Sequence, residues 1–124
     1  MARSHRELLV WQKAKKLAVH VYKASEHFPR TEIYGLVSQV RRASVSVVSN
    51  IAEGQGRLTP GEFVHFLGQA RGSLIELETQ LDIAFEIAYL DADQQDSFSN
   101  EIYEVLGLLN RLIESLRRRR TVLP

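Results

Sequence analysis

The chain has 124 residues, of which 44% are hydrophobic and 25% are charged, an ordinary composition for one globular domain long enough to bury a core. Its formal net charge is +1, so the sum alone indicates neither a basic nor an acidic partner. The chain has no cysteine, which excludes a disulfide framework and a thiolate metal site and fits a reducing compartment.

Residues 1–6 lead directly into an amphipathic stretch, without the apolar core of a signal peptide. No apolar run approaches the roughly 18 residues that a membrane-spanning helix needs. We therefore expect a cytoplasmic protein without a membrane partner.

Four segments carry apolar residues at helical spacing, and none shows sustained strand-like alternation. They predict helices at about residues 7–27, 32–53, 60–89 and 92–118, within a single domain that covers residues 1–124. Phe28-Pro29 ends the first helix because proline cannot continue the hydrogen-bond ladder. We place Tyr22 and Ile33 on core faces and expect Thr31 to cap the second helix. The β-branched stretch from Val45 to Ile51 leaves a strand as the local alternative.

The third and fourth helices have clear start signals. Thr59 precedes Pro60, and Glu62 follows three residues after Thr59, which predicts a capping box. Asp91, followed by Gln94, opens the fourth helix. Helices of roughly 20–29 residues with short connections favour an all-α, antiparallel up-down-up-down four-helix bundle. Two long hairpins that dimerise are the alternative.

Apolar residues of the third segment extend beyond one face. A second row at helical spacing consists of Gly68, Gly72, Ile75, Thr79, Ile83 and Ile87. One buried face of about 100° is enough for a helix of a bundle, so the wider face predicts another neighbour. We expect a second subunit to contact this row, and its broadening of the core within one chain is the alternative.

The side chains give little support to catalysis. A bundle metal centre needs Glu-x-x-His pairs on two helices, and the chain has one such pair, Glu62 and His65. His20 and His27 follow a stripe of lysines that would repel a metal ion, so we expect them to be solvated. No cysteine nucleophile, Gly-x-Ser-x-Gly motif or P-loop is present. We predict no enzyme, no cofactor and no metal site.

Basic and acidic residues are separated along the chain. Residues 1–30 carry seven Lys or Arg against two Glu, whereas residues 59–90 carry one Arg against five acidic residues. Such separation suits packing between elements and also contact with a polyanion. The candidate phosphate contacts are Arg41, Arg42, Arg57, Arg117, Arg118, Arg119 and Arg120. The alternatives are an ion pair of Arg41 with Glu76 or Glu78, and a solvated last turn for the arginine run.

Four ordered motifs carry a family resemblance. They are residues 9–14 (LVWQKA), 34–44 (YGLVSQVRRAS), 49–54 (SNIAEG) followed by Gly56-Arg57, and 72–81 (GSLIELETQL). Together they resemble the four-helix-bundle proteins encoded in 23S rRNA intervening sequences, over about residues 7–117. This family is similar to the accessory proteins of diversity-generating retroelements, which form basic pentameric barrels that engage nucleic acid.

The resemblance implies an up-down bundle, a homopentamer and no known enzymatic activity. It also singles out Asn50, Glu53 and Gly54 as motif residues without an assigned role. Our leading hypothesis is an oligomeric binding or scaffolding module whose target is RNA or an RNA-associated protein. The second hypothesis is a protein-only assembly module, and a bundle metalloenzyme is the third.

Overall fold

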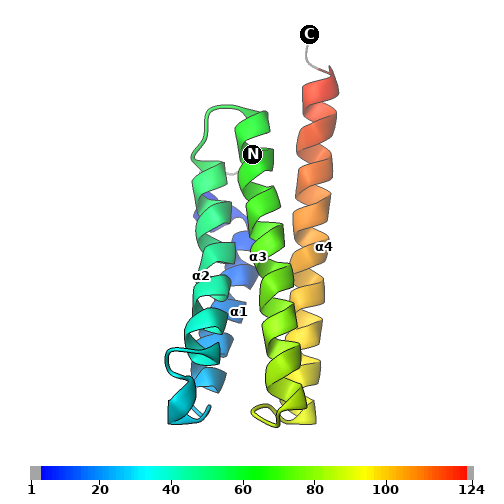
Figure 1. Ribbon diagram of the computed structural model, residues 1–124. Coiled ribbons are helices and arrows are strands. Elements are labelled where there is room, and N and C mark those ends of the chain that lie inside the picture. The colour runs from blue at the N-terminus through cyan, green and yellow to red at the C-terminus, as the bar shows by residue number, and fades with distance from the viewer. Residues whose placement is uncertain (1–3, 123–124) are drawn as a thin grey trace.

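The computed structural model describes the backbone of residues 4–122 and the side chains of residues 4–119. Its elements are η1 (His5–Glu7), α1 (Leu9–Ser25), η2 (Arg30–Glu32), α2 (Leu36–Gln55), α3 (Pro60–Glu86) and α4 (Ala92–Val122). The four α-helices run alternately in opposite directions (Figure 1), which confirms the predicted all-α bundle. None of the helices in the described part is both long and apolar enough to cross a bilayer.

The second helix begins later than predicted. Residues 30–32 form a separate 3-10 turn, and Gly35 has a non-helical backbone, with φ of −110° and ψ of −113°. Thr31 therefore does not cap α2. Instead, the Glu32 carboxylate accepts a hydrogen bond from the Leu36 N–H at 3.1 Å. From Leu36 the helix is continuous to Gln55, so the strand alternative for Val45 to Ile51 is wrong.

The residues predicted to start α3 and α4 form capping hydrogen bonds. The Thr59 hydroxyl accepts from the Glu62 N–H at 3.2 Å. At α4, Asp91 accepts from the Gln94 N–H at 2.8 Å, and the Gln94 side chain accepts from the Asp91 N–H at 2.9 Å. These bonds satisfy amides that would otherwise lack partners at the helix N-termini.

The third helix ends at Glu86, three residues before the predicted end. Ala88 adopts a left-handed φ of 66°, and the Tyr89 N–H donates to the Ala84 carbonyl at 2.8 Å. This geometry is a helix C-cap that usually carries glycine, so an alanine here costs conformational energy, about 1–2 kcal/mol. The turn reverses the chain into α4.

The core is a continuous set of apolar side chains from all four helices. Leu67, Leu74 and Leu77 of α3 and Leu109 of α4 are fully buried. Burial of one such side chain contributes about 1.5–3 kcal/mol to folding. The expectation that Tyr22 and Ile33 lie on core faces is wrong: Tyr22 is 41% exposed, and Ile33 lies before α2 and is 58% exposed. Phe85, which the periodicity of the third segment also places inward, is 39% exposed.

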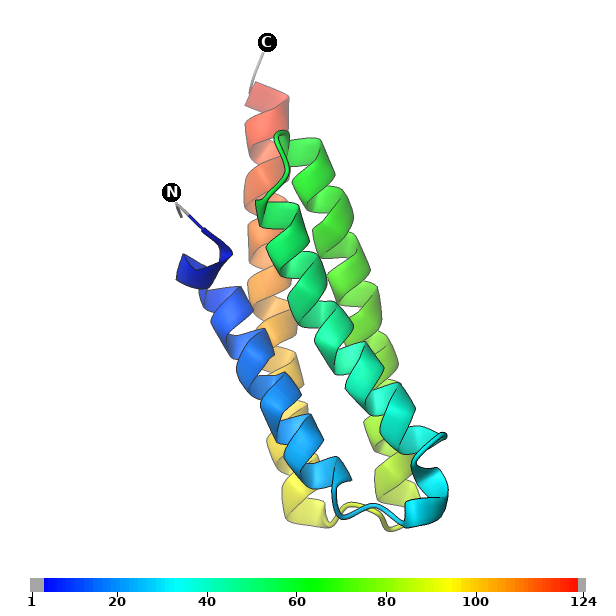
Figure 2. The same ribbon diagram turned by 90° about the vertical axis from the view of Figure 1, so that its left-hand side faces the viewer.

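The helices pack in the cyclic order α1, α2, α3, α4, with the most extensive contact between α2 and α3 and the least between α1 and α4. Figure 2 shows that α4 continues well past the start of α1 at the upper end of the bundle. This difference in length leaves one corner of that end without a helix.

Candidate functional site: the basic end of the bundle

The up-down topology brings the turn between α2 and α3 to the same end as the last turns of α4 (Figure 1). Arg57 lies in that turn, and Arg117, Arg118 and Arg119 lie on the exposed last turns of α4. Four of the seven predicted cations therefore gather at one end. The backbone of Arg120 belongs to α4, but its side chain lies outside the described side chains.

A pocket of about 270 Å³, which we call the end pocket, occupies this end. Its position matches the corner that the short α1 leaves open. Arg57 and Arg119 contribute to its lining, and no carboxylate does. The complete lining is Leu8, Gln55, Arg57, Leu58, Thr59, Pro60, Phe63, Leu112, Leu116 and Arg119.

Arg57 is held in place by two neighbours. Its Nη2 donates to the Glu53 carboxylate at 2.8 Å, and its guanidinium carbon lies 4.5 Å from the centre of the Phe66 ring. The Arg57 and Glu53 side chains are 40% and 54% exposed, and ion pairs of that exposure contribute little to stability. The two contacts orient the guanidinium and leave part of it open to solvent.

Arg41 and Arg42 do not belong to this end. Arg41 donates to the Ser25 hydroxyl at 2.9 Å and to the Tyr22 carbonyl at 3.3 Å, and it lies 4.7 Å from the centre of the Tyr22 ring. It is thus tied to α1, so the predicted ion pair with Glu76 or Glu78 is wrong. Arg42 is exposed on α2, roughly 20 Å from the end of that helix at 1.5 Å per residue.

Asn50, Glu53 and Gly54 have structural contacts at the corner between α2 and α3. Asn50 donates to the Ser46 carbonyl at 2.9 Å, one turn earlier in α2. A Cβ atom on Gly54 would lie only 2.9 Å from Phe63 Cδ1 and 3.0 Å from Phe66 Cβ. Glycine therefore permits the closest approach of the two helices, and Glu53 positions Arg57.

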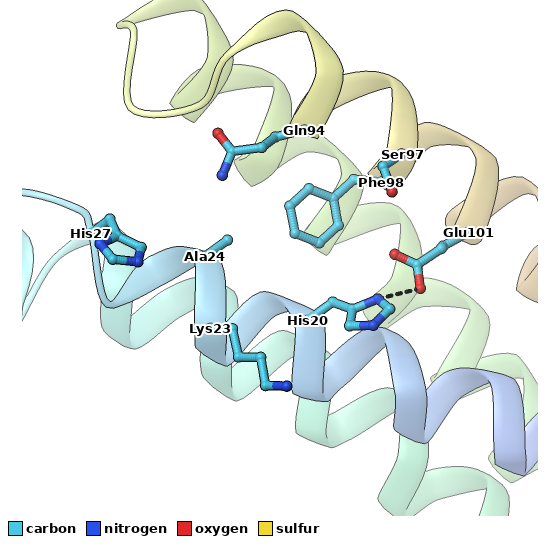
Figure 3. Close-up of a pocket in the computed structure, with 8 residues that line it drawn as sticks. All are labelled: His20, Lys23, Ala24, His27, Gln94, Ser97, Phe98 and Glu101. Atoms are coloured by element: carbon cyan, nitrogen blue, oxygen red, sulfur yellow. Dashed lines mark hydrogen bonds and ion pairs between the residues drawn. The ribbon is translucent and has the colours of Figure 1, made fainter.

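A second pocket, of about 410 Å³, lies between α1 and α4 at the other half of the bundle (Figure 3). His20 points from α1 toward α4, where its Nδ1 is 2.7 Å from a Glu101 carboxylate oxygen. The prediction of a solvated His20 is wrong in this respect, whereas His27 is exposed as expected. A neighbouring pair, Lys13 and Glu104 at 3.5 Å, joins the same two helices.

The histidine–carboxylate pair resembles two parts of a catalytic triad, but its neighbour Ser97 does not complete it as a nucleophile. A triad requires a nucleophile hydrogen-bonded to the imidazole. No such bond joins Ser97 to His20 among the described side chains, and these side chains contain no group of three or more potential metal ligands. The pair's evident role is to bridge α1 and α4, the helices in least contact.

The apolar row on α3 is exposed in the single chain. Ile75, Ile83 and Ile87 are 41%, 46% and 47% exposed, and nothing lies within 4 Å of a Cβ atom built on Gly68 or Gly72. The alternative, in which this row broadens the core of the single chain, is therefore wrong. Whether a second subunit contacts it stays a prediction.

Sequence reasoning missed two features. The His20–Glu101 pair joins residues 81 positions apart, and neither residue has a local signal for the other. The end pocket depends on the unequal lengths of α1 and α4. One signal could have indicated it: Leu58, an apolar residue beside Arg57 in a turn, is 97% exposed.

Comparison with known proteins places the fold and the family. A crystal structure at 1.70 Å of a protein with unknown function, from the S23 ribosomal protein family of Bacteroides thetaiotaomicron, is similar with a TM-score of 0.79. The identity is 22%, and the match covers 86% of this chain and 96% of that one, which supports the fold. Comparison with curated proteins gives no match. The family model described as 23S rRNA-intervening sequence protein matches residues 6–111, and the chain therefore belongs to that family.

Proposed function

We propose that the protein is a non-enzymatic binding module that assembles with copies of itself. The observation that carries this proposal is the presence of two exposed apolar surfaces of opposite charge on different sides of the bundle. Large exposed apolar surface on a folded domain is typical of an interaction site.

The first surface is a groove of about 430 Å³ between α1 and α2, which we call the basic groove. Its floor is apolar, and three of its members, Val19, Tyr22 and Val45, are each 41–43% exposed. Lys15 and Lys23 line its edges, Arg41 stacks on Tyr22, and no carboxylate lines the groove. The complete lining is Lys15, Ala18, Val19, Tyr22, Lys23, Val45, Val48 and Ser49.

The second surface is the exposed row of α3, which we call the acidic ridge. Its apolar members are Ile75, Ile83 and Ile87. Because Gly68 and Gly72 have no side chains, another backbone can approach the ridge closely at these two positions. Carboxylates accompany the isoleucines, all of them exposed: Glu76, Glu78, Asp82 and Glu86.

An apolar groove edged by cations complements an apolar ridge edged by carboxylates. Charge complementarity directs association, and the apolar contact supplies most of the affinity. Because groove and ridge are different surfaces of one chain, the contact between copies would be heterologous, and such contacts form a ring when the rotation closes. A closed ring of five subunits is the number that the family resemblance implies.

Single substitutions in either surface test this assembly. Val19→Glu places a carboxylate in the groove, which would oppose the carboxylates of the ridge, and Ile83→Glu adds a charge to the apolar row. We expect each variant to sediment as a monomer at concentrations where the wild type is an oligomer. Tyr103→Glu, at an 80% exposed position of α4 outside both surfaces, is the matched control. A monomeric wild type at micromolar concentration would overturn the proposal.

A second candidate function is the binding of RNA at the basic end. Its support is that Arg57 and Arg119 line one pocket that no carboxylate lines, and that Arg117 and Arg118 lie at the same end of the bundle. Cations gathered in this way suit contact with several phosphates, and each contact makes binding more sensitive to salt. If RNA does not bind, the module assembles and binds through protein contacts alone.

Electrophoretic mobility of a structured RNA at 50 and 200 mM salt tests this second function. We expect binding that weakens strongly at the higher concentration, because the contacts are to phosphate. Replacing Arg117, Arg118 and Arg119 by glutamine should reduce both affinity and salt dependence, whereas Arg30→Gln, in η2 at the opposite end of the bundle, should not. Equal mobility with and without protein at the lower salt would contradict RNA binding.

A further inference from the structure

The end pocket joins an apolar wall to a cationic rim. Most of its wall is hydrocarbon, from Leu8 before α1, Leu58 and Pro60 of the α2–α3 turn, Phe63 of α3, and Leu112 and Leu116 of α4. A ligand that fits these walls must bury apolar surface. The pocket opens toward solvent where Leu58 is almost fully exposed, at 97%.

The charge of the rim restricts the ligand further. Arg57 and Arg119 are the charged residues that line the pocket, and Arg117 and Arg118 are exposed on the same last turns of α4. Two polar side chains, Gln55 and Thr59, complete the lining. The pocket therefore suits an apolar, ring-sized group that is followed directly by negative charge.

We propose that the end pocket holds one unpaired base of an RNA strand, while Arg57 and Arg119 contact the phosphates on either side of that nucleotide. Proteins commonly recognise single-stranded RNA by stacking a splayed-out base on an aromatic or guanidinium plane. Here Phe63 is the aromatic residue of the wall, and Arg57 presents a guanidinium whose orientation Glu53 and Phe66 fix. Leu58 covers the base from the open side.

This inference rests on the second candidate function and makes it specific. A basic end alone would bind duplex and single strand according to their phosphates. A base pocket adds a preference for strands with unpaired bases, because a base within a duplex is already stacked and paired. The pocket thus selects single-stranded or looped RNA.

Fluorescence anisotropy with two labelled probes tests the proposal: a 12-nucleotide single-stranded RNA and a blunt duplex of the same strand with its complement. We expect the single strand to bind about tenfold more tightly, the size of one base–aromatic contact. Leu58→Ser removes the apolar cover of the base without adding a charge beside Arg57, and because Leu58 is a solvent-exposed turn residue the fold is retained. This variant should lose the preference for the single strand and keep duplex binding.

Arg119→Gln should weaken both probes and reduce the salt dependence, because it removes a phosphate contact. Tyr103→Asp on α4 should change neither. Equal affinity of wild type for single strand and duplex, with normal salt dependence, would overturn the base pocket and leave RNA binding in place. Absence of binding to both probes would overturn both. If decanoate competes with RNA and the single strand binds no more tightly than the duplex, the pocket holds an aliphatic anion, and the base pocket is overturned.

Discussion

Gly54 shows how a single residue sets the distance between two helices. The position of its missing Cβ lies 2.9 Å from Phe63 Cδ1, a separation that real Cβ atoms do not adopt. We predict that Gly54→Ala destabilises the fold by about 1–2 kcal/mol, since overpacking exceeds the gain in helix propensity.

Urea unfolding in an Ile83→Glu background measures this effect without a contribution from assembly. Gly68→Ala is the matched control, because open space surrounds Gly68. The control should raise stability by about 0.5–1 kcal/mol. A stabilised Gly54→Ala variant would show that the α2–α3 contact tolerates a wider spacing.

Glu32 links the start of α2 to the end of α3. The hydrogen bond from the Leu36 N–H, followed by the one from the Tyr89 hydroxyl, lowers the pKa of Glu32 below its usual 4.5. The same contact with Glu32 raises the pKa of Tyr89 above 10.0. A lowered carboxyl pKa stabilises the fold above the unfolded pKa, and this contribution disappears as pH falls through the folded pKa.

We therefore predict that wild type exceeds Glu32→Gln in stability at pH 7 and that the difference shrinks as pH falls below about 4.5. Unfolding curves of both proteins between pH 3 and 7 measure it, and Glu26→Gln, on an exposed carboxylate, is the control. A difference that stayed constant over this range would rule out a stabilising role for ionised Glu32.

At the scale of the element, local signals predicted the helices well where a side chain caps an N-terminus. Thr59 and Asp91 act as expected because capping depends on residues three apart in sequence. The start of α2 was missed because Glu32 and the backbone of Gly35, rather than Thr31, set it. The end of α3 depends on a left-handed alanine, which no residue preference announces.

Gly72 affects two properties: it lowers the stability of α3, and it lets a second copy approach the acidic ridge. Replacement by alanine meets no atom within 4 Å in the single chain, so Gly72→Ala should stabilise α3 by about 0.5–1 kcal/mol. The same methyl group would hold back a second copy on the acidic ridge and should therefore weaken assembly. Thermal unfolding and sedimentation of one variant measure the two effects. Increased stability with unchanged association would place the partner elsewhere.

For the molecule as a whole, the sequence predicted four helices and their order. It did not predict which side chains gather at each end of the bundle. The family resemblance and the helical periodicity both indicated the fold. Arg57 and Arg119 line the same pocket because α3 and α4 run in opposite directions, so that α4 returns the chain to the end at which α3 begins. The contacts of Arg41 could not be predicted from the topology, because its partners on α1 depend on the angle at which α1 and α2 pack.

Mixing two variants that are each defective in one surface tests the two-surface assembly. Val19→Glu retains an intact ridge, and Ile83→Glu retains an intact groove. If the contact is heterologous, each variant alone is monomeric, and an equimolar mixture forms a one-to-one dimer through the intact pair of surfaces. We predict a doubling of the mass in sedimentation equilibrium only on mixing. A mixture that remained monomeric, or a single variant that dimerised alone, would contradict the claim.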